Sequence, residues 1–138
     1  MPVDPSLAGR TFPPTAPYTV TEERVREFAA AIGAPYDGGP APATFPIVVA
    51  FGAMTGLMED PEVGIALHRV VHGEQRFSYT RPVQVGDVLT AELTVDSLRQ
   101  IGGADIIATA SEITDASGEV VCTGKATLVH SSPSEAAQ

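Results

Sequence analysis

Ile47-Val48-Val49-Ala50-Phe51-Gly52-Ala53-Met54-Thr55-Gly56-Leu57-Met58 is the most apolar stretch of the chain and decides its fold. Because a bilayer takes about 20 residues to cross, this run predicts a buried helix and not a membrane span. Apolar side chains surround the whole circumference, so we expect the helix to be buried on every side. Thr44 is expected to cap it, with Pro46 in the first turn. Gly52 and Gly56 are expected to form a smooth strip against which another backbone packs.

Downstream of this helix the apolar period changes from 3.6 residues to 2, which is the period of half-buried strands. Strands are expected over 71–80, 89–96, 105–114 and 119–130. The last three follow one another through short turns and should form an antiparallel meander. A curved antiparallel sheet after one wholly apolar helix suggests that the sheet wraps around that helix. The sequence therefore predicts an α+β fold of the hot-dog kind.

Upstream, prolines should hold the segment 10–18 extended, since proline fixes φ and removes a donor. A helix is expected over 21–32, capped by Thr21 and ended by Gly33. Its apolar stripe, with spacings of three and four residues, consists of Val25, Phe28, Ala29 and Ile32.

Length and composition limit the possible classes of protein. The 138 residues predict a single domain over 1–130, followed by a disordered tail over 131–138. A net charge of −9 argues against nonspecific nucleic-acid binding. The lone Cys122 excludes an intrachain disulfide and favours a reducing, cytoplasmic location. We expect no membrane segment, no export signal, no metal site and no cofactor.

Six segments carry a resemblance to a known family: Gly9–Tyr18, Glu23–Gly33, Pro42–Pro46, Val70–Phe77, Arg81-Pro82-Val83 and Gly86-Asp87. Together, over about residues 5–130, they resemble the MaoC-like dehydratase family. The similarity is to its small actinobacterial HadA-like subunits and to the N-terminal halves of double-hot-dog hydratases.

The resemblance implies chemistry on 3-hydroxyacyl thioesters, from which active members remove water with an Asp and a His just after the first helix. Ala34 stands where that Asp is expected, and none of the histidines, His68, His72 and His130, lies nearby. The resemblance therefore implies a non-catalytic subunit that binds an acyl-CoA or acyl-carrier-protein thioester, as a homodimer or with a catalytic hot-dog partner. The alternatives are an active (R)-specific enoyl hydratase and a hot-dog thioesterase.

Three residues are weak candidates for acid–base chemistry. His72 and Glu74, two positions apart, are expected on one strand face and would form a pair. Asp37 would be a displaced base, although Asp-Gly-Gly is more typical of a turn. The alternative for the pair is a solvated strand face. Arg69, Arg76 and Arg81 are candidates for contact with a phosphate or an acidic carrier protein, or are simply solvated charges.

The start of the central helix is the expected place for a thioester carbonyl, because helix N-termini offer free amides. The amides expected to donate belong to Phe45, Ile47 and Val48. The acyl chain would continue along apolar side chains, and the competing interpretation is that these pack together and leave no channel. The predicted binding residues are Thr44, Phe45, Ile47, Phe51, Met54, Phe77 and Tyr79.

Overall fold

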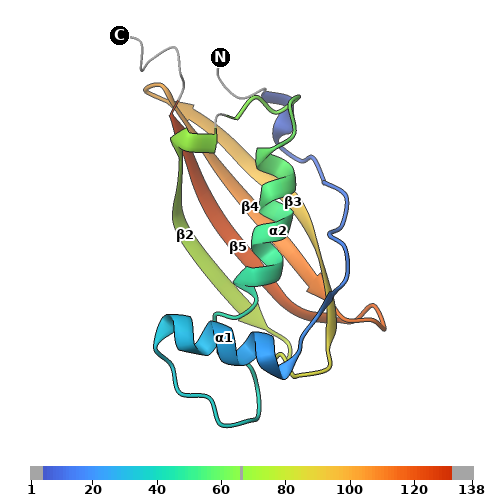
Figure 1. The fold of residues 1–138 in the computed structure, drawn as a ribbon. Helices are drawn as coiled ribbons and strands as arrows, with labels where there is room; N and C mark the ends of the chain where they lie inside the picture. The colour runs from blue at the N-terminus through green and yellow to red at the C-terminus, as the bar shows by residue number, and fades with distance from the viewer. Residues whose placement is uncertain (1–4, 66, 132–138) are drawn as a thin grey trace.

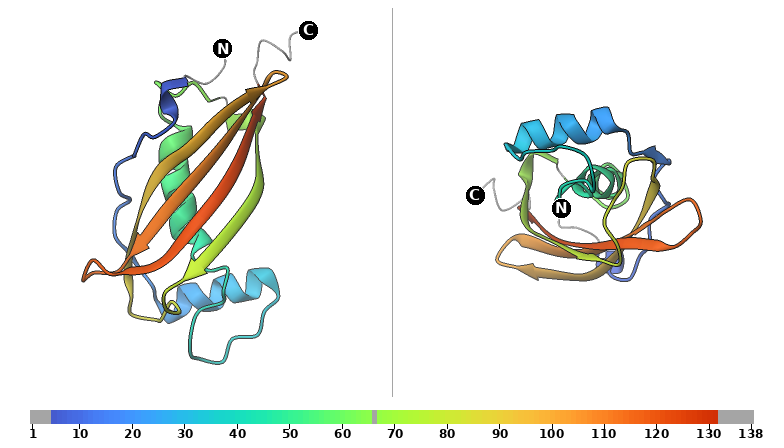
Figure 2. Two further views of the ribbon diagram at one scale, coloured as in Figure 1. Left: turned by 180° about the vertical axis from the view of Figure 1, so that it is seen from behind. Right: turned by 90° about the horizontal axis from the view of Figure 1, so that it is seen from below.

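The protein is described by a computed structural model that covers residues 5–65 and 67–131 (Figure 1). One five-stranded antiparallel sheet, in the order β1-β3-β4-β5-β2, curves around a central helix (Figure 2). The predicted α+β hot-dog fold is confirmed. The elements in chain order are η1 (Pro5–Leu7), β1 (Tyr18–Thr19), α1 (Glu22–Ile32), α2 (Ile47–Met58), η2 (Leu67–Arg69), β2 (Val70–Tyr79), β3 (Val88–Ile101), β4 (Ala104–Thr114) and β5 (Val120–Ser131). Of the tail expected at 131–138, Ser131 ends β5 and the remainder lies outside the described residues.

The first helix begins and ends where the sequence predicts. The Thr21 hydroxyl accepts a hydrogen bond from the Arg24 amide at 3.2 Å, and Gly33 ends the helix at φ 72°. A φ of this sign favours glycine, which has no Cβ to clash. Val25 is buried, but Ile32 in the last turn is 50% exposed, so the apolar stripe ends one turn earlier than predicted.

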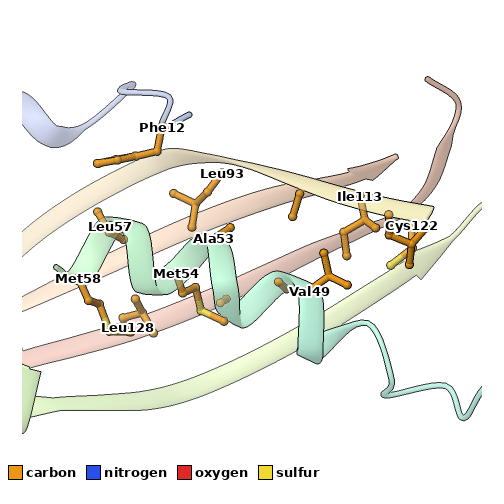
Figure 3. Close-up of a cluster of buried hydrophobic side chains, with 14 of the residues drawn as sticks. Phe12, Val49, Ala53, Met54, Leu57, Met58, Leu93, Ile113, Cys122 and Leu128 are labelled. Carbon is orange, nitrogen blue, oxygen red and sulfur yellow. The ribbon is translucent and has the colours of Figure 1, made fainter. Parts of the chain in front are cut away.

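The central helix α2 packs over β3 and β4, and its buried face includes Val49, Ala53 and Leu57 (Figure 3). The prediction that it is buried on every side is wrong for the described chain, because Phe51 is 51% exposed. The sheet curves around only part of the helix (Figure 2), and Phe51, Gly52 and Gly56 on the rest of its surface are exposed. No helix in the part of the chain that the structure describes is both long and apolar enough to span a membrane.

The two edges of the sheet differ. The extended N-terminal segment runs along β3, where the Phe12 amide donates to the Leu93 carbonyl at 2.8 Å. The same segment brings the Thr15 methyl group within 3.7 Å of where a Cβ on Gly52 would lie, which is an ordinary side-chain contact. A Cβ on Gly56 would meet nothing within 4 Å, so the expected strip for close packing of another backbone is wrong. At the other edge, β5 is the single strand that pairs with β2 within residues 5–65 and 67–131. One side of the ten-residue strand β2 is therefore left without a neighbour among the described residues.

Candidate functional site

A groove of about 460 Å³ lies between the C-terminal half of α2 and the edge strand β2. This volume is within the range of small-molecule sites. Its apolar lining consists of Phe51, Met54, Met58, Val70 and Leu128, and its polar lining of Thr55, Glu59 and His72. Met54 and Met58 project from α2 on the side where Leu128 lies on β5 (Figure 3). A mostly apolar groove with a few polar groups suits a ligand with a long apolar part.

The helical period explains why α2 contributes four of these residues and its C-cap, Glu59, a fifth. Phe51, Met54, Thr55, Met58 and Glu59 have spacings of three and four residues, so they share one face. The neighbouring face of the helix packs on the sheet. Predicted binding residues Phe51 and Met54 thus lie in the groove, while Thr55, Met58 and Glu59 were not predicted. Their shared face with Phe51 was the signal that would have identified them.

On β2, the predicted pair of His72 and Glu74 is wrong. The pairing of β2 with β5 shifts by one residue at Gly73, between these two residues. Such a bulge reverses the alternation of side chains, because one extra residue is inserted. His72 therefore lines the groove, where its Nε2 lies 3.0 Å from Gln75 Oε1. Glu74 lies on the outer face and pairs with Arg76 at 2.7 Å.

The start of α2 offers no free amides at the positions expected for a thioester carbonyl. The amides of Phe45, Ile47 and Val48 donate at 2.9, 3.1 and 3.0 Å to the carbonyls three residues before each, in successive turns. Thr44 is exposed and does not cap the helix, because Pro46 occupies the N-cap position without a side-chain bond. The expectation of free donors here is wrong.

Two predicted binding residues near this helix start have packing roles. Phe45 is fully buried, 5.4 Å from Phe28 between ring centroids, so it belongs to the core. Ile47 is half-buried and packs against the same core.

The remaining two predicted binding residues are on β2. Phe77 is half-buried and faces the interior opposite Gly124 on β5. Tyr79, 39% exposed, donates its hydroxyl to the Ala43 carbonyl, and burial raises the pKa of that phenol to about 12. It lines a second pocket of about 360 Å³ beside Ala43 and Arg81.

Arg81 is occupied by carboxylates of its own chain. Its guanidinium donates to both Asp87 oxygens at 2.9 and 3.2 Å and to Asp115 at 3.1 Å. These bonds raise its pKa further above its already high usual value. The Ser117 hydroxyl and then Arg81 lower the pKa of Asp115 to about 2. Arg81 therefore ties two turns together, which competes with the predicted role in binding phosphate.

Three further side chains lie away from the groove lining. Asp37 is exposed in the loop after α1 (Figure 1). Tyr36 packs under the Arg26 guanidinium, 5.4 Å from the ring centroid. Cys122 is buried on β5, and burial raises the pKa of its thiol to about 11, which disfavours the reactive thiolate. Within the described ranges, no three potential metal ligands cluster.

Comparison with known proteins agrees with the fold. The sequence model of the family described as "FAS1-like, dehydratase domain region" matches residues 6–124. A UPF0336 protein of Leifsonia xyli subsp. xyli is 46% identical over 143 residues, covering 94% of this chain and 96% of the relative. A UPF0336 protein of Streptomyces coelicolor is 42% identical over 153 residues, covering 99% and 100%.

Solved structures also match. A chain of the HadBC (3R-hydroxyacyl-ACP dehydratase) complex from Mycobacterium tuberculosis is similar at TM-score 0.76 and 29% identity, covering 89% of this chain and 96% of that one. A MaoC-like dehydratase is similar at TM-score 0.77 and 29% identity, covering 94% of this chain but 43% of that one.

Proposed function

Because the chain belongs to the FAS1-like dehydratase-region family of MaoC-like hot-dog proteins, we propose that it binds the acyl chain of a thioester as the non-catalytic subunit of a (3R)-hydroxyacyl dehydratase. The carrier is coenzyme A or an acyl carrier protein. The observation that carries this proposal is the apolar groove between α2 and β2. Each methylene group buried there contributes about 0.8 kcal/mol, so the affinity should rise with the length of the acyl chain.

The dehydration removes a proton from C2 and the hydroxyl from C3 of the substrate, which leave together as water. This step needs a base and an acid in defined positions. Ala34 stands where active family members are expected to carry the Asp, and a methyl group transfers no proton. We therefore assign both proton transfers to a second subunit.

The open edge of β2 supports a partner of the same fold. Val71 on this strand is 64% exposed, and the strand has no second neighbour among the described residues. A second hot-dog subunit that pairs with this edge would extend the sheet and cover the exposed side of the groove. The similar HadBC chain belongs to a complex, which is consistent with such an arrangement. We expect the assembly in the cytoplasm, where Cys122 stays reduced.

Co-expression with a hot-dog chain that contains the Asp and His pair tests this function. Light scattering should give the mass of a heterodimer or a multiple of it, and hydration of enoyl-CoA should require both chains. Met54→Trp, which fills the groove, should reduce acyl-CoA binding at least tenfold. Gly56→Ala, on the same helix but outside the groove lining, is the matched control. Full activity of this chain alone would contradict the proposal.

One observation favours a second candidate function, hydratase activity of this chain alone. Glu59 and His72 both line the groove, so a carboxylate and an imidazole face one apolar space. Substitutions Glu59→Gln and His72→Ala would each reduce such activity about 10²–10⁴-fold. If the purified chain has no activity before substitution, this candidate is excluded.

A further inference from the structure

Two separate cavities follow one another along the inner face of β2. The 460 Å³ groove reaches β2 at Val70 and His72, and the 360 Å³ pocket reaches it at Tyr79. The inward-facing positions between them are Gln75 and Phe77, which line neither cavity. The run of cavities along the inner face of β2 is therefore interrupted at these two side chains, between the groove beside α2 and the pocket beside Ala41 and Ala43.

The contacts of these two side chains explain why they interrupt it. A Cβ added to Gly124 of β5 would lie 3.1 Å from Phe77 Cε1 and 3.1 Å from Gln75 Nε2. Both side chains thus lie against the bare backbone of Gly124, where any larger residue would displace them. Gln75 is also held by His72, whose Nε2 lies 3.0 Å from Gln75 Oε1. Phe77 has no polar group and is held by packing alone.

We propose that Phe77 is the partition between the two cavities and sets the length of the linear apolar chain that the groove accepts. The inference rests on the proposed function for the identity of that chain as the acyl part of a thioester. The chain would enter beside Phe51 and Met58 and lie along α2 until its end meets the Phe77 ring. Removal of the ring would join the groove to the pocket beside Tyr79 and leave room for further methylene groups.

The experiment compares the full-length wild type with Phe77→Ala and Phe77→Leu, alone and with the hot-dog partner. Ser78→Ala, exposed on the next position of the same strand, is the control. Isothermal titration with linear acyl-CoAs of increasing length, against CoA as a blank, measures the length dependence. A series of linear 1-alkanols probes the groove without a thioester. Circular dichroism melting establishes whether each variant is folded. If Phe77→Ala is not folded, Phe77→Leu alone is compared with the wild type.

In the wild type and in Ser78→Ala, we expect affinity to rise about fourfold per methylene and then to level off at one length. In Phe77→Ala the rise should continue to longer chains, and Phe77→Leu should be intermediate. The same levelling length in folded Phe77 variants and wild type, or no levelling in the wild type, would overturn the inference. If neither series binds, the inference also fails. A levelling length that shifts for 1-alkanols, while no acyl-CoA binds better than CoA, would support the partition and contradict the proposed function.

Discussion

Asp105 and His130 are partners across the ladder of β4 and β5, and the His130 Nδ1 lies 2.8 Å from Asp105 Oδ2 with both side chains buried. Gln100 of β3 donates to the other Asp105 oxygen, also at 2.8 Å. Three neighbouring strands are thus linked near the end of the sheet by the buried Asp105–His130 pair and the exposed Gln100. Removing either side chain of this pair should destabilise the protein, because the other side chain loses a buried polar contact.

We expect His130→Ala to lower the free energy of unfolding by about 3 kcal/mol, since the Asp105 carboxylate loses a buried partner. Urea denaturation followed by circular dichroism measures the change. Asp96→Asn, an exposed substitution on β3, is the control and should change stability by less than about 0.5 kcal/mol. Equal effects of the two substitutions would contradict a structural role for the pair.

The turn that holds Asp115 should make stability depend on pH in the acid range. Hydrogen bonds from Ser117 and Arg81 lower its pKa from the ordinary 3.8 to about 2 in the folded protein. Because the pKa of Asp115 is lower in the folded than in the unfolded protein, its ionised form stabilises the fold at pH values above the unfolded pKa. This contribution is lost as the pH falls from about 4 to about 2. As the pH is lowered from 5 to 2, the free energy of unfolding should fall less steeply for Asp115→Asn than for wild type. A slope equal to that of wild type would show that the turn does not favour the ionised carboxylate. Asp96→Asn controls for the change in net charge.

Thr109 on the inner face of β4 is 2% exposed, and its Oγ1 has no hydrogen-bond partner within the described residues. A buried hydroxyl without a partner costs about 1–3 kcal/mol. Thr109→Val, of nearly the same shape, should therefore raise the free energy of unfolding by about 1 kcal/mol. Thr109→Ser keeps the hydroxyl and loses a methyl group, so it should be less stable than wild type. Destabilisation by Thr109→Val in urea would mean that the hydroxyl has a partner, such as a bound water.

Gly124→Ala should destabilise the protein by about 1–2 kcal/mol, because the new methyl group meets Phe77 and Gln75 at 3.1 Å. Most of this cost should disappear in a Phe77→Ala background, which a double-mutant cycle in urea would measure. Gly56→Ala in α2 is the matched control. Its Cβ meets nothing within 4 Å, so it should stabilise the protein by up to about 1 kcal/mol. Additive effects of Gly124→Ala and Phe77→Ala would show that the contact is not the cause.

Local patterns in the sequence determined where the helices and strands lie. Thr21 and Gly33 bound α1 because capping depends on hydrogen bonds and φ angles within a few residues. The apolar run of α2 and the two-residue apolar period of β3, β4 and β5 predicted the hot-dog fold, because the burial of side chains follows the apolar period within each helix or strand. The family resemblance also predicts, without a structure, that Ala34 stands where active members carry the Asp.

Only the tertiary structure decided how these elements form the groove. The bulge at Gly73 puts His72 and Glu74 on opposite faces, and it follows from the register against β5, which is distant in sequence. Likewise, Arg81 is engaged by Asp87 and Asp115 because two turns meet in space. Local patterns such as side-chain alternation, capping and apolar period depend on residues close together in the sequence. Strand register and ion pairing, in contrast, are set by contacts between segments far apart in sequence. Those long-range contacts made His72 part of the groove and directed Glu74 away from it.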